Sequence, residues 1–140
     1  MTINQLQDDI IEEFAIFDEW FDKYGRIIEL GNELPPFDEA KRTPQNLIEG
    51  CQSKVWIDAH LDENGNVIFQ GDSDAVIVKG ILALLIQVMS EHSPAEILST
   101  ELYFIDQIGL KEHLSPTRSN GLLAMVKQMK YYALAFQAKA

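Results

Sequence analysis

The chain has 140 residues, 46% hydrophobic and 24% charged, which is the size and composition of one ordinary globular domain. One cysteine excludes an internal disulfide, and without a run of 18 apolar residues no transmembrane helix is expected. The net charge of −11 argues against nucleic acid and against an anionic membrane as partners, because both repel an acidic surface.

The acidic charge is concentrated in the first half of the chain. Residues 1–74 carry 17 acidic and five basic side chains, whereas residues 75–140 carry five and six. This imbalance leaves open a protein partner with a basic face, or simply a charge that favours solubility. The start of the chain lacks the basic and apolar stretches of a secretory signal, and with a free thiol this favours the reducing cytosol.

The first part of the chain is expected to be helical. Thr2 to Gln5 fits a capping box, and apolar residues at helical spacing predict an amphipathic helix over about 3–22. A second short helix is expected from Tyr24 to Leu30. Gly31-Asn32 should end it, because both residues tolerate a positive φ. The prolines that follow predict an extended loop.

From Lys54 onward, apolar and polar residues alternate with the period of a strand. A second apolar run covers Val67 to Phe69, and Asn64-Gly65 between the two runs is a strong hairpin signal. Residues 46–49 are a candidate third strand. We therefore expect an antiparallel sheet of two to four strands.

The rest of the chain is expected to be helical. Ser73 or Asp74 should cap a helix reaching Val88, and Ser93-Pro94 a short second helix. Another short helix is expected over 102–108, and a last one after Ser115-Pro116. The predicted architecture is α+β, with helices on one face of a small antiparallel sheet, in a single domain over 1–140.

Cys51 is the first candidate functional residue. Gly50 removes a side chain beside the sulfur and so permits a tight turn and close approach by another molecule. A loop held by a rigid sheet is where reactive groups are commonly placed. A buried, inert thiol is the alternative.

The three histidines, His60, His92 and His113, do not have metal-ligand spacing to Cys51 or to one another, so no metal site is expected. Each is expected at the surface or at a helix cap. A Cys–His pair formed in space remains open, because such pairs need not be neighbours in sequence.

Two further segments carry charge next to predicted helix starts. Asp72 and Asp74 are expected to cap a helix and compensate its dipole. Arg118 lies among hydroxyl side chains at the start of the last helix, where backbone N–H groups favour an anion. Arg118 could serve an anion site or pair internally with Asp72 or Asp74, and both readings are open.

Taken in order, these motifs resemble the SufE family of sulfur acceptors, which work with cysteine desulfurases. Each motif is short, but the ordered set spans nearly the whole chain. The matching stretches are Trp20 to Tyr24, Leu30-Gly31 with Leu34-Pro35, Gly50-Cys51-Gln52-Ser53 with Val55-Trp56, Gly71 to Ala75, Val78-Lys79-Gly80, and Leu114 to Ser119.

The resemblance implies that Cys51 accepts sulfur as a persulfide, activates the desulfurase and delivers sulfur for iron–sulfur cluster assembly. It also implies an α+β fold like that of the cluster scaffolds of the IscU type. Gly50, Gln52, Asp74 and Arg118 would then support the Cys51 loop or the docking face. The implied partners are a desulfurase of the SufS type and a downstream scaffold complex, with a homodimer left open.

The resemblance implies no bound cofactor, because pyridoxal phosphate is on the desulfurase. The chain would act as a sulfur-transfer partner rather than as a stand-alone enzyme. Two rival functions remain: a thiol enzyme that pairs Cys51 with His60 or His113, and a non-catalytic adaptor with a core cysteine.

Overall fold

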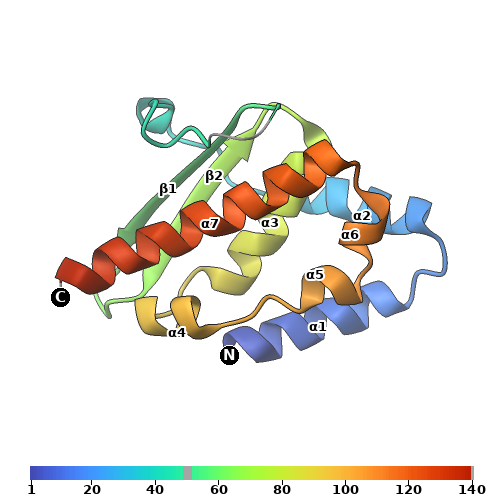
Figure 1. Ribbon diagram of the computed structural model, residues 1–140, viewed down its shortest axis with the longest axis horizontal. Helices are drawn as coiled ribbons and strands as arrows, with labels where there is room; N and C mark the ends of the chain where they lie inside the picture. Colours follow the sequence, from blue (N-terminus) through green and yellow to red (C-terminus); the bar gives the residue numbers. More distant parts are fainter. Residues whose placement is uncertain (49–51, 140) are drawn as a thin grey trace.

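The computed structural model describes residues 1–48 and 52–139, in which helices pack against one side of an antiparallel hairpin (Figure 1). The expected α+β class is confirmed. In chain order the elements are α1 (Ile3–Ala15), α2 (Trp20–Asn32), a short 3₁₀ helix η1 (Glu39–Lys41), β1 (Val55–Leu61), β2 (Val67–Ser73), α3 (Val76–Met89), α4 (Pro94–Ser99), α5 (Phe104–Gln107), α6 (Leu110–His113) and α7 (Pro116–Lys139).

The hairpin forms where it was predicted. β1 and β2 are antiparallel, with Val55 opposite Ser73 and Leu61 opposite Val67. Gly65 has a φ of 79°, which glycine adopts without strain. The Asp62 carboxylate accepts the N–H groups of Asn64 and Asn66, both at 2.9 Å. The local sequence therefore suffices for this turn.

The candidate third strand over 46–49 is, in its described part, a single bridge between Leu47 and Trp56. Ile48 N–H donates to the Val55 carbonyl oxygen at 2.8 Å, and Ile57 N–H donates to that of Asn46 at 2.9 Å. The chain just before residue 49 is therefore fixed to β1.

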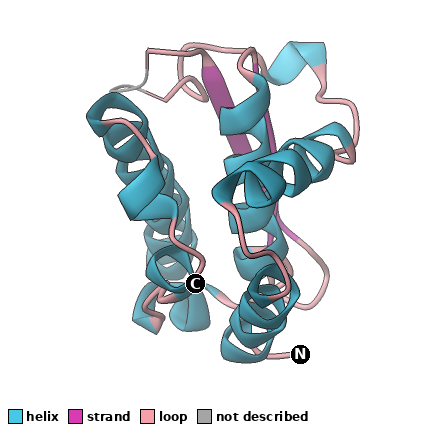
Figure 2. Ribbon diagram, turned by 90° about the vertical axis from the view of Figure 1, so that its right-hand side faces the viewer, coloured by secondary structure: helices cyan, strands magenta, loops and turns pink. Residues whose placement is uncertain are grey.

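Helices α3 and α7 cover the hairpin, with α3 packed on β2 and α7 on β1. Figure 2 shows the strands behind the helices in the view turned by 90°. Helix α3 carries apolar side chains on nearly all sides, because the sheet, α1, α2 and α7 all pack against it. Its buried apolar residues dominate the core: Ile77, Val78, Ile81, Leu82, Ala83, Leu84, Leu85, Val88 and Met89.

The predicted first helix over 3–22 is wrong at its end. The Thr2–Gln5 capping box is present, but α1 ends at Ala15 and α2 begins at Trp20. Phe14 and Phe17 meet edge to face across the end of α1, with ring centroids 6.0 Å apart. Two helices both present apolar residues to α3, so helical periodicity alone concealed the break.

Gly31 lies inside α2 and does not end it through a positive φ, contrary to the prediction. The helix ends at Asn32, and its cap Glu33 has a φ of −83°. A Cβ on Gly31 would lie 2.7 Å from the backbone nitrogen of Gly80, so Gly31 is needed for close packing of α2 on α3.

The predicted caps are met in part. Ser93 caps α4 by accepting Glu96 N–H at 3.2 Å, and Ser115 Oγ accepts Arg118 N–H at 3.3 Å. The cap of α3 is Ala75, however, rather than Ser73 or Asp74. The short helix α6, between Gly109 and Leu114, was not predicted. Throughout residues 1–48 and 52–139, every helix is too short or too polar to cross a bilayer.

Candidate functional site

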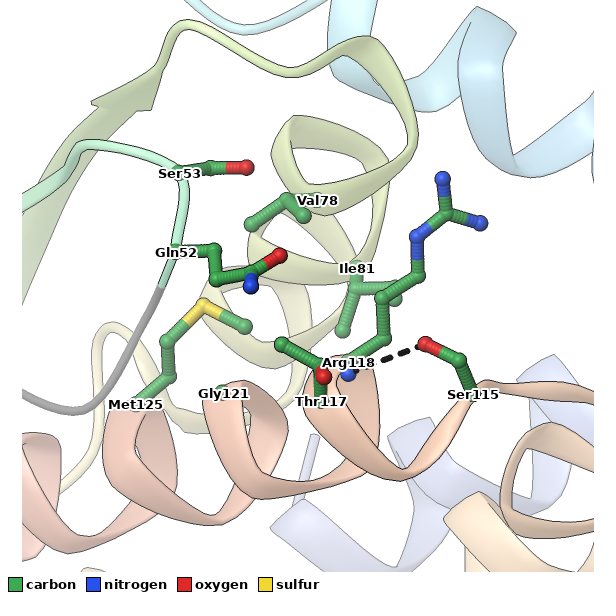
Figure 3. A pocket seen from close by; sticks show the side chains of 9 residues that line it. All are labelled: Gln52, Ser53, Val78, Ile81, Ser115, Thr117, Arg118, Gly121 and Met125. Carbon is green, nitrogen blue, oxygen red and sulfur yellow. Dashed lines mark hydrogen bonds between the residues drawn. The ribbon is translucent and has the colours of Figure 1, made fainter.

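A hollow of about 400 Å³ opens between residues 52–53, which precede β1, helix α3 and the first turns of α7 (Figure 3). The predicted site residues Gly50 and Cys51 lie outside the described residues, and Gln52 is the first described residue after them. Gln52 and Arg118, both predicted to support the site, line this hollow. The full lining is Gln52, Ser53, Val78, Ile81, Ser115, Thr117, Arg118, Gly121 and Met125.

The hollow has an apolar floor and a polar rim. Val78 and Ile81 from α3 and Met125 from α7 are buried and supply the floor. Figure 3 shows Gln52 reaching in from the loop and Arg118 rising from the first turn of α7. Such a site can hold a small apolar atom while polar groups control entry.

Arg118 does not pair with Asp72 or Asp74, so that predicted alternative is wrong. Each carboxylate is occupied by other groups, as described below. Within the described part of the chain, the Arg118 guanidinium forms no ion pair, although its backbone N–H bonds Ser115 Oγ. A positive charge at the rim of the hollow is therefore left to act on whatever occupies it.

Asp74 was predicted to shape the Cys51 loop, and it bonds the chain three residues after that cysteine. Lys54 N–H donates to Asp74 Oδ1 at 3.0 Å, and Asp74 N–H donates to the Lys54 carbonyl oxygen at 3.2 Å. Asp74 thus ties Lys54 to the turn that leads into α3.

Asp72 has a different set of partners. Its carboxylate lies 2.6 Å from Arg42 Nη2 and 3.3 Å from Lys79 Nζ, and it accepts Ser73 N–H at 2.8 Å. Partial burial alone would raise the pKa of Asp72, but these hydrogen bonds outweigh it and hold the pKa below the usual value. The Arg42 guanidinium also lies 4.7 Å from the centre of the Trp56 ring. This cluster fixes the loop before residue 48 against the hairpin.

A tyrosine that sequence reasoning missed anchors the chain before Cys51. Tyr132 on α7 reaches Asn46 Oδ1 at 2.6 Å and the Ile57 carbonyl oxygen at 2.9 Å. Burial raises the pKa of Tyr132 above its usual value. Its partners lie 86 and 75 residues away in sequence, so no local pattern could predict this contact. Tyr132 thus fixes Asn46, and with it the chain before Ile48, to β1 and α7.

The histidines are placed apart from the hollow. His92 is buried, so the predicted surface position is wrong. Its ring nitrogens lie 2.9 Å from the carbonyl oxygen of Ser90, the C-cap residue of α3, and 2.8 Å from that of Met1. His60 is exposed on β1, and His113 stacks on Trp20 with ring centroids 4.5 Å apart. No histidine is among the described residues that line the hollow. Over the same residues, no group of three or more His, Asp or Glu side chains could hold a metal ion.

Comparison with known proteins agrees with the resemblance seen in the motifs. A family model described as "SufE: Fe-S metabolism associated domain" matches residues 8–133. The chain belongs to the SufE family. This membership associates it with iron–sulfur metabolism.

Two relatives of this SufE-family protein illustrate the match. An uncharacterised SufE-like protein of Rhizobium etli is 44% identical over 127 residues, which cover 88% of this chain and 86% of that protein. The solution structure of a hypothetical protein from Thermus thermophilus has the same fold. It aligns with a TM-score of 0.78 and 20% identity, over 95% of this chain and 96% of that one.

Proposed function

We propose that this SufE-family protein accepts sulfur from a cysteine desulfurase onto Cys51, stimulates that enzyme and delivers the sulfur for iron–sulfur cluster assembly. One observation carries the proposal. The only cysteine of this SufE-family chain, Cys51, is followed in sequence by Gln52. Gln52 lines a hollow with an apolar floor and a cationic rim.

The proposed transfer is an exchange between sulfur atoms. The Cys51 thiolate attacks the outer sulfur of a persulfide on the desulfurase, forming a new S–S bond, and the S–S bond to the enzyme cysteine breaks. The enzyme leaves as a thiolate that takes up a proton, so the step needs no added oxidant or reductant. Its rate depends on the thiolate fraction, on the leaving thiol and on access.

The walls of the hollow suit the product of this exchange. A persulfide exposed to solvent would be lost to passing thiols, and an apolar recess lowers that access. Val78, Ile81 and Met125 supply such a recess, and Gln52, the residue that follows Cys51 in sequence, lines it. The Arg118 charge at the rim favours an anionic sulfur over a neutral one.

The proposed reaction places few other demands on this chain. Pyridoxal phosphate would stay on the desulfurase, and Cys51 would hold sulfur without a metal or cofactor of its own. A free thiol must stay reduced, which the cytosol ensures. The sulfur would pass next to a cluster-scaffold complex by a second exchange of the same kind.

Intact-mass spectrometry tests the proposal. Incubation with the desulfurase of the same organism and with cysteine should add the mass of one sulfur atom to this chain, and a reductant should remove it. Cys51→Ser should show no gain, and omission of the desulfurase should abolish it. An unmodified chain under the complete conditions would rule out the carrier.

Activity measurements with and without the desulfurase separate the rival functions. A stand-alone thiol enzyme would turn over a substrate without the desulfurase, and an adaptor would stimulate the desulfurase equally well as Cys51→Ser. A carrier requires both the partner and the thiol.

A further inference from the structure

The outward face of α7 carries a row of exposed residues that the fold does not use. Leu123, Lys127, Tyr131 and Leu134 are spaced by four, four and three residues, which places them on one side of a helix. We call this row the α7 ridge. Its three apolar members are 58%, 63% and 52% exposed, whereas residues on the opposite side of α7, such as Met125 and Met129, are buried.

A shallow hollow borders the ridge on each side. One, of about 220 Å³, is lined by Leu122, Leu123 and Val126 of α7 and by Leu102 and Ile105. The other, of about 340 Å³, includes Ala124, Lys127, Gln128 and Tyr131 of α7 with Pro44, Leu47 and Ile48. A ridge between two hollows is a surface shape to which a partner can be complementary. An exposed apolar patch of this kind marks an interaction surface.

This surface is continuous with the candidate site. Ile48, the last described residue before the segment that holds Cys51, lines the hollow beside Tyr131. Gln52, the first described residue after it, lines the hollow described above. Helix α7 contributes to both walls, so a protein seated on the ridge also lies next to the two ends of the Cys51 segment.

The charge of α7 is opposite to that of the rest of the chain. The helix has four basic residues and no acidic one, whereas the remaining residues carry seven basic and 22 acidic side chains. Lys130 donates to the Thr100 carbonyl oxygen at 2.7 Å. Lys127 on the ridge is exposed and forms no ion pair with any described residue. A partner with carboxylates around an apolar stripe would complement this surface.

We infer that the α7 ridge is the docking surface for the sulfur-donating desulfurase, through an enzyme segment that presents apolar side chains edged by carboxylates. The inference rests on the proposed function, because the donor must bring its persulfide within about 3.5 Å of Cys51 and so must cover adjacent surface.

A second copy fits the surface less well. Two ridges facing each other across a two-fold axis would place two copies of a helix with basic and no acidic side chains in contact, and like charges oppose association. A ridge on the acidic face of another copy would form an open chain rather than a closed dimer.

Binding measurements with the intact proteins test the inference. Titration calorimetry of the desulfurase at low ionic strength should show at least about tenfold weaker binding for Lys127→Glu, and a similar loss for Leu123→Ser with Tyr131→Ser. Lys139→Glu makes the same charge change at the end of the same helix, and Phe21→Ser replaces an exposed apolar residue on α2. Both control variants should bind within about twofold of the unsubstituted protein, because they leave the ridge intact.

Failure of the docking surface and failure of the carrier function give different results. At saturating desulfurase, Lys127→Glu should still gain one sulfur atom on Cys51. If the unsubstituted chain gains sulfur and Lys127→Glu binds the desulfurase as tightly as the unsubstituted chain, the docking inference is overturned and the carrier function stands. If the unsubstituted chain gains no sulfur, the carrier function falls and the inference with it. Loss of self-association, or of binding to the downstream scaffold alone, in Lys127→Glu would also overturn the inference.

Discussion

Lys54 and Asp74 are joined by two hydrogen bonds, one in each direction. The backbone N–H of Lys54 donates to the Asp74 carboxylate at 3.0 Å, and the backbone N–H of Asp74 donates to the Lys54 carbonyl oxygen at 3.2 Å. One of these bonds depends on the Asp74 side chain. A substitution there can therefore loosen residues 52–54 without removing the rest of the hairpin.

We expect Asp74→Ala to make Cys51 more reactive. Losing the acceptor of Lys54 N–H removes about 1 kcal/mol of restraint three residues from the cysteine, which corresponds to about a fivefold change in the population of open loop. The rate of Cys51 alkylation by iodoacetamide, followed by intact mass, should rise by about that factor.

Asp74→Asn is the matched control, because it removes the charge and keeps the oxygen that accepts Lys54 N–H. Its alkylation rate should stay within about twofold of the unsubstituted protein. Similar acceleration in both variants would assign the effect to charge and contradict the hydrogen-bond argument.

Some parts of the fold and of the candidate site could be predicted from the sequence, and others could not. Asn64-Gly65 and Thr2–Gln5 act through neighbouring residues, so the hairpin and the first cap could be predicted. The ion-pair partner of Asp72 could not be predicted from local sequence. Arg42 lies thirty residues away, and its position depends on packing over Trp56, which only the folded loop creates. The roles of Gly50 and Cys51 stay predictions from the family motif.

The same reasoning explains the error at residues 16–19. The apolar spacing from Leu6 to Phe21 fits one long helix as well as two short ones. The choice between one helix and two depends on the packing of α1 and α2 on α3. These are tertiary contacts, which the local spacing of apolar residues does not contain. Local patterns fixed the type of element here and left its boundary open.

Arg118 should accelerate sulfur transfer through its charge. Arg118→Gln removes a cation from the rim of the hollow, so sulfur loading of Cys51 should slow by about two- to fivefold at low ionic strength and by less at high salt. Arg118→Lys keeps the charge and should retain most of the rate. Single-turnover loading, measured by mass at saturating desulfurase, separates this effect from binding. Equal slowing in both variants would instead indicate that the shape of the guanidinium matters.

The Asp72 cluster should make stability depend on pH. Because the pKa of Asp72 in the folded protein lies below the usual value of 3.8, its stabilising effect is fully present above that value and is lost as the pH falls through the lower folded pKa. Asp72→Asn should therefore lower the free energy of unfolding by about 1 kcal/mol at pH 7, and the difference should vanish in acid.

Urea unfolding of both proteins from pH 7 to pH 2.5 measures this difference. Asp106→Asn is the control, since Asp106 and Lys111 are 65% and 60% exposed and lie 3.8 Å apart. Such a surface pair contributes little, so the control should unfold like the unsubstituted protein at every pH. A difference for Asp72→Asn that persists unchanged into acid would contradict an electrostatic origin.

The contact between α2 and α3 should tolerate no side chain at Gly80. A Cβ there would overlap the Ile27 carbonyl oxygen and lie 2.6 Å from Ile27 Cγ2, and neither backbone can shift without disturbing the core. Gly80→Ala should therefore lower the free energy of unfolding by about 2–3 kcal/mol, the cost of overpacking a close contact.

Gly25→Ala makes the same substitution in α2, where nothing lies within 4 Å of the added Cβ. It should raise the free energy of unfolding by about 0.5–1 kcal/mol, because alanine restricts the unfolded chain and favours the helix. Chemical denaturation of the two variants should thus give shifts of opposite sign. A loss of stability in both variants would mean that α2 does not have the helical conformation on which its contact with α3 depends.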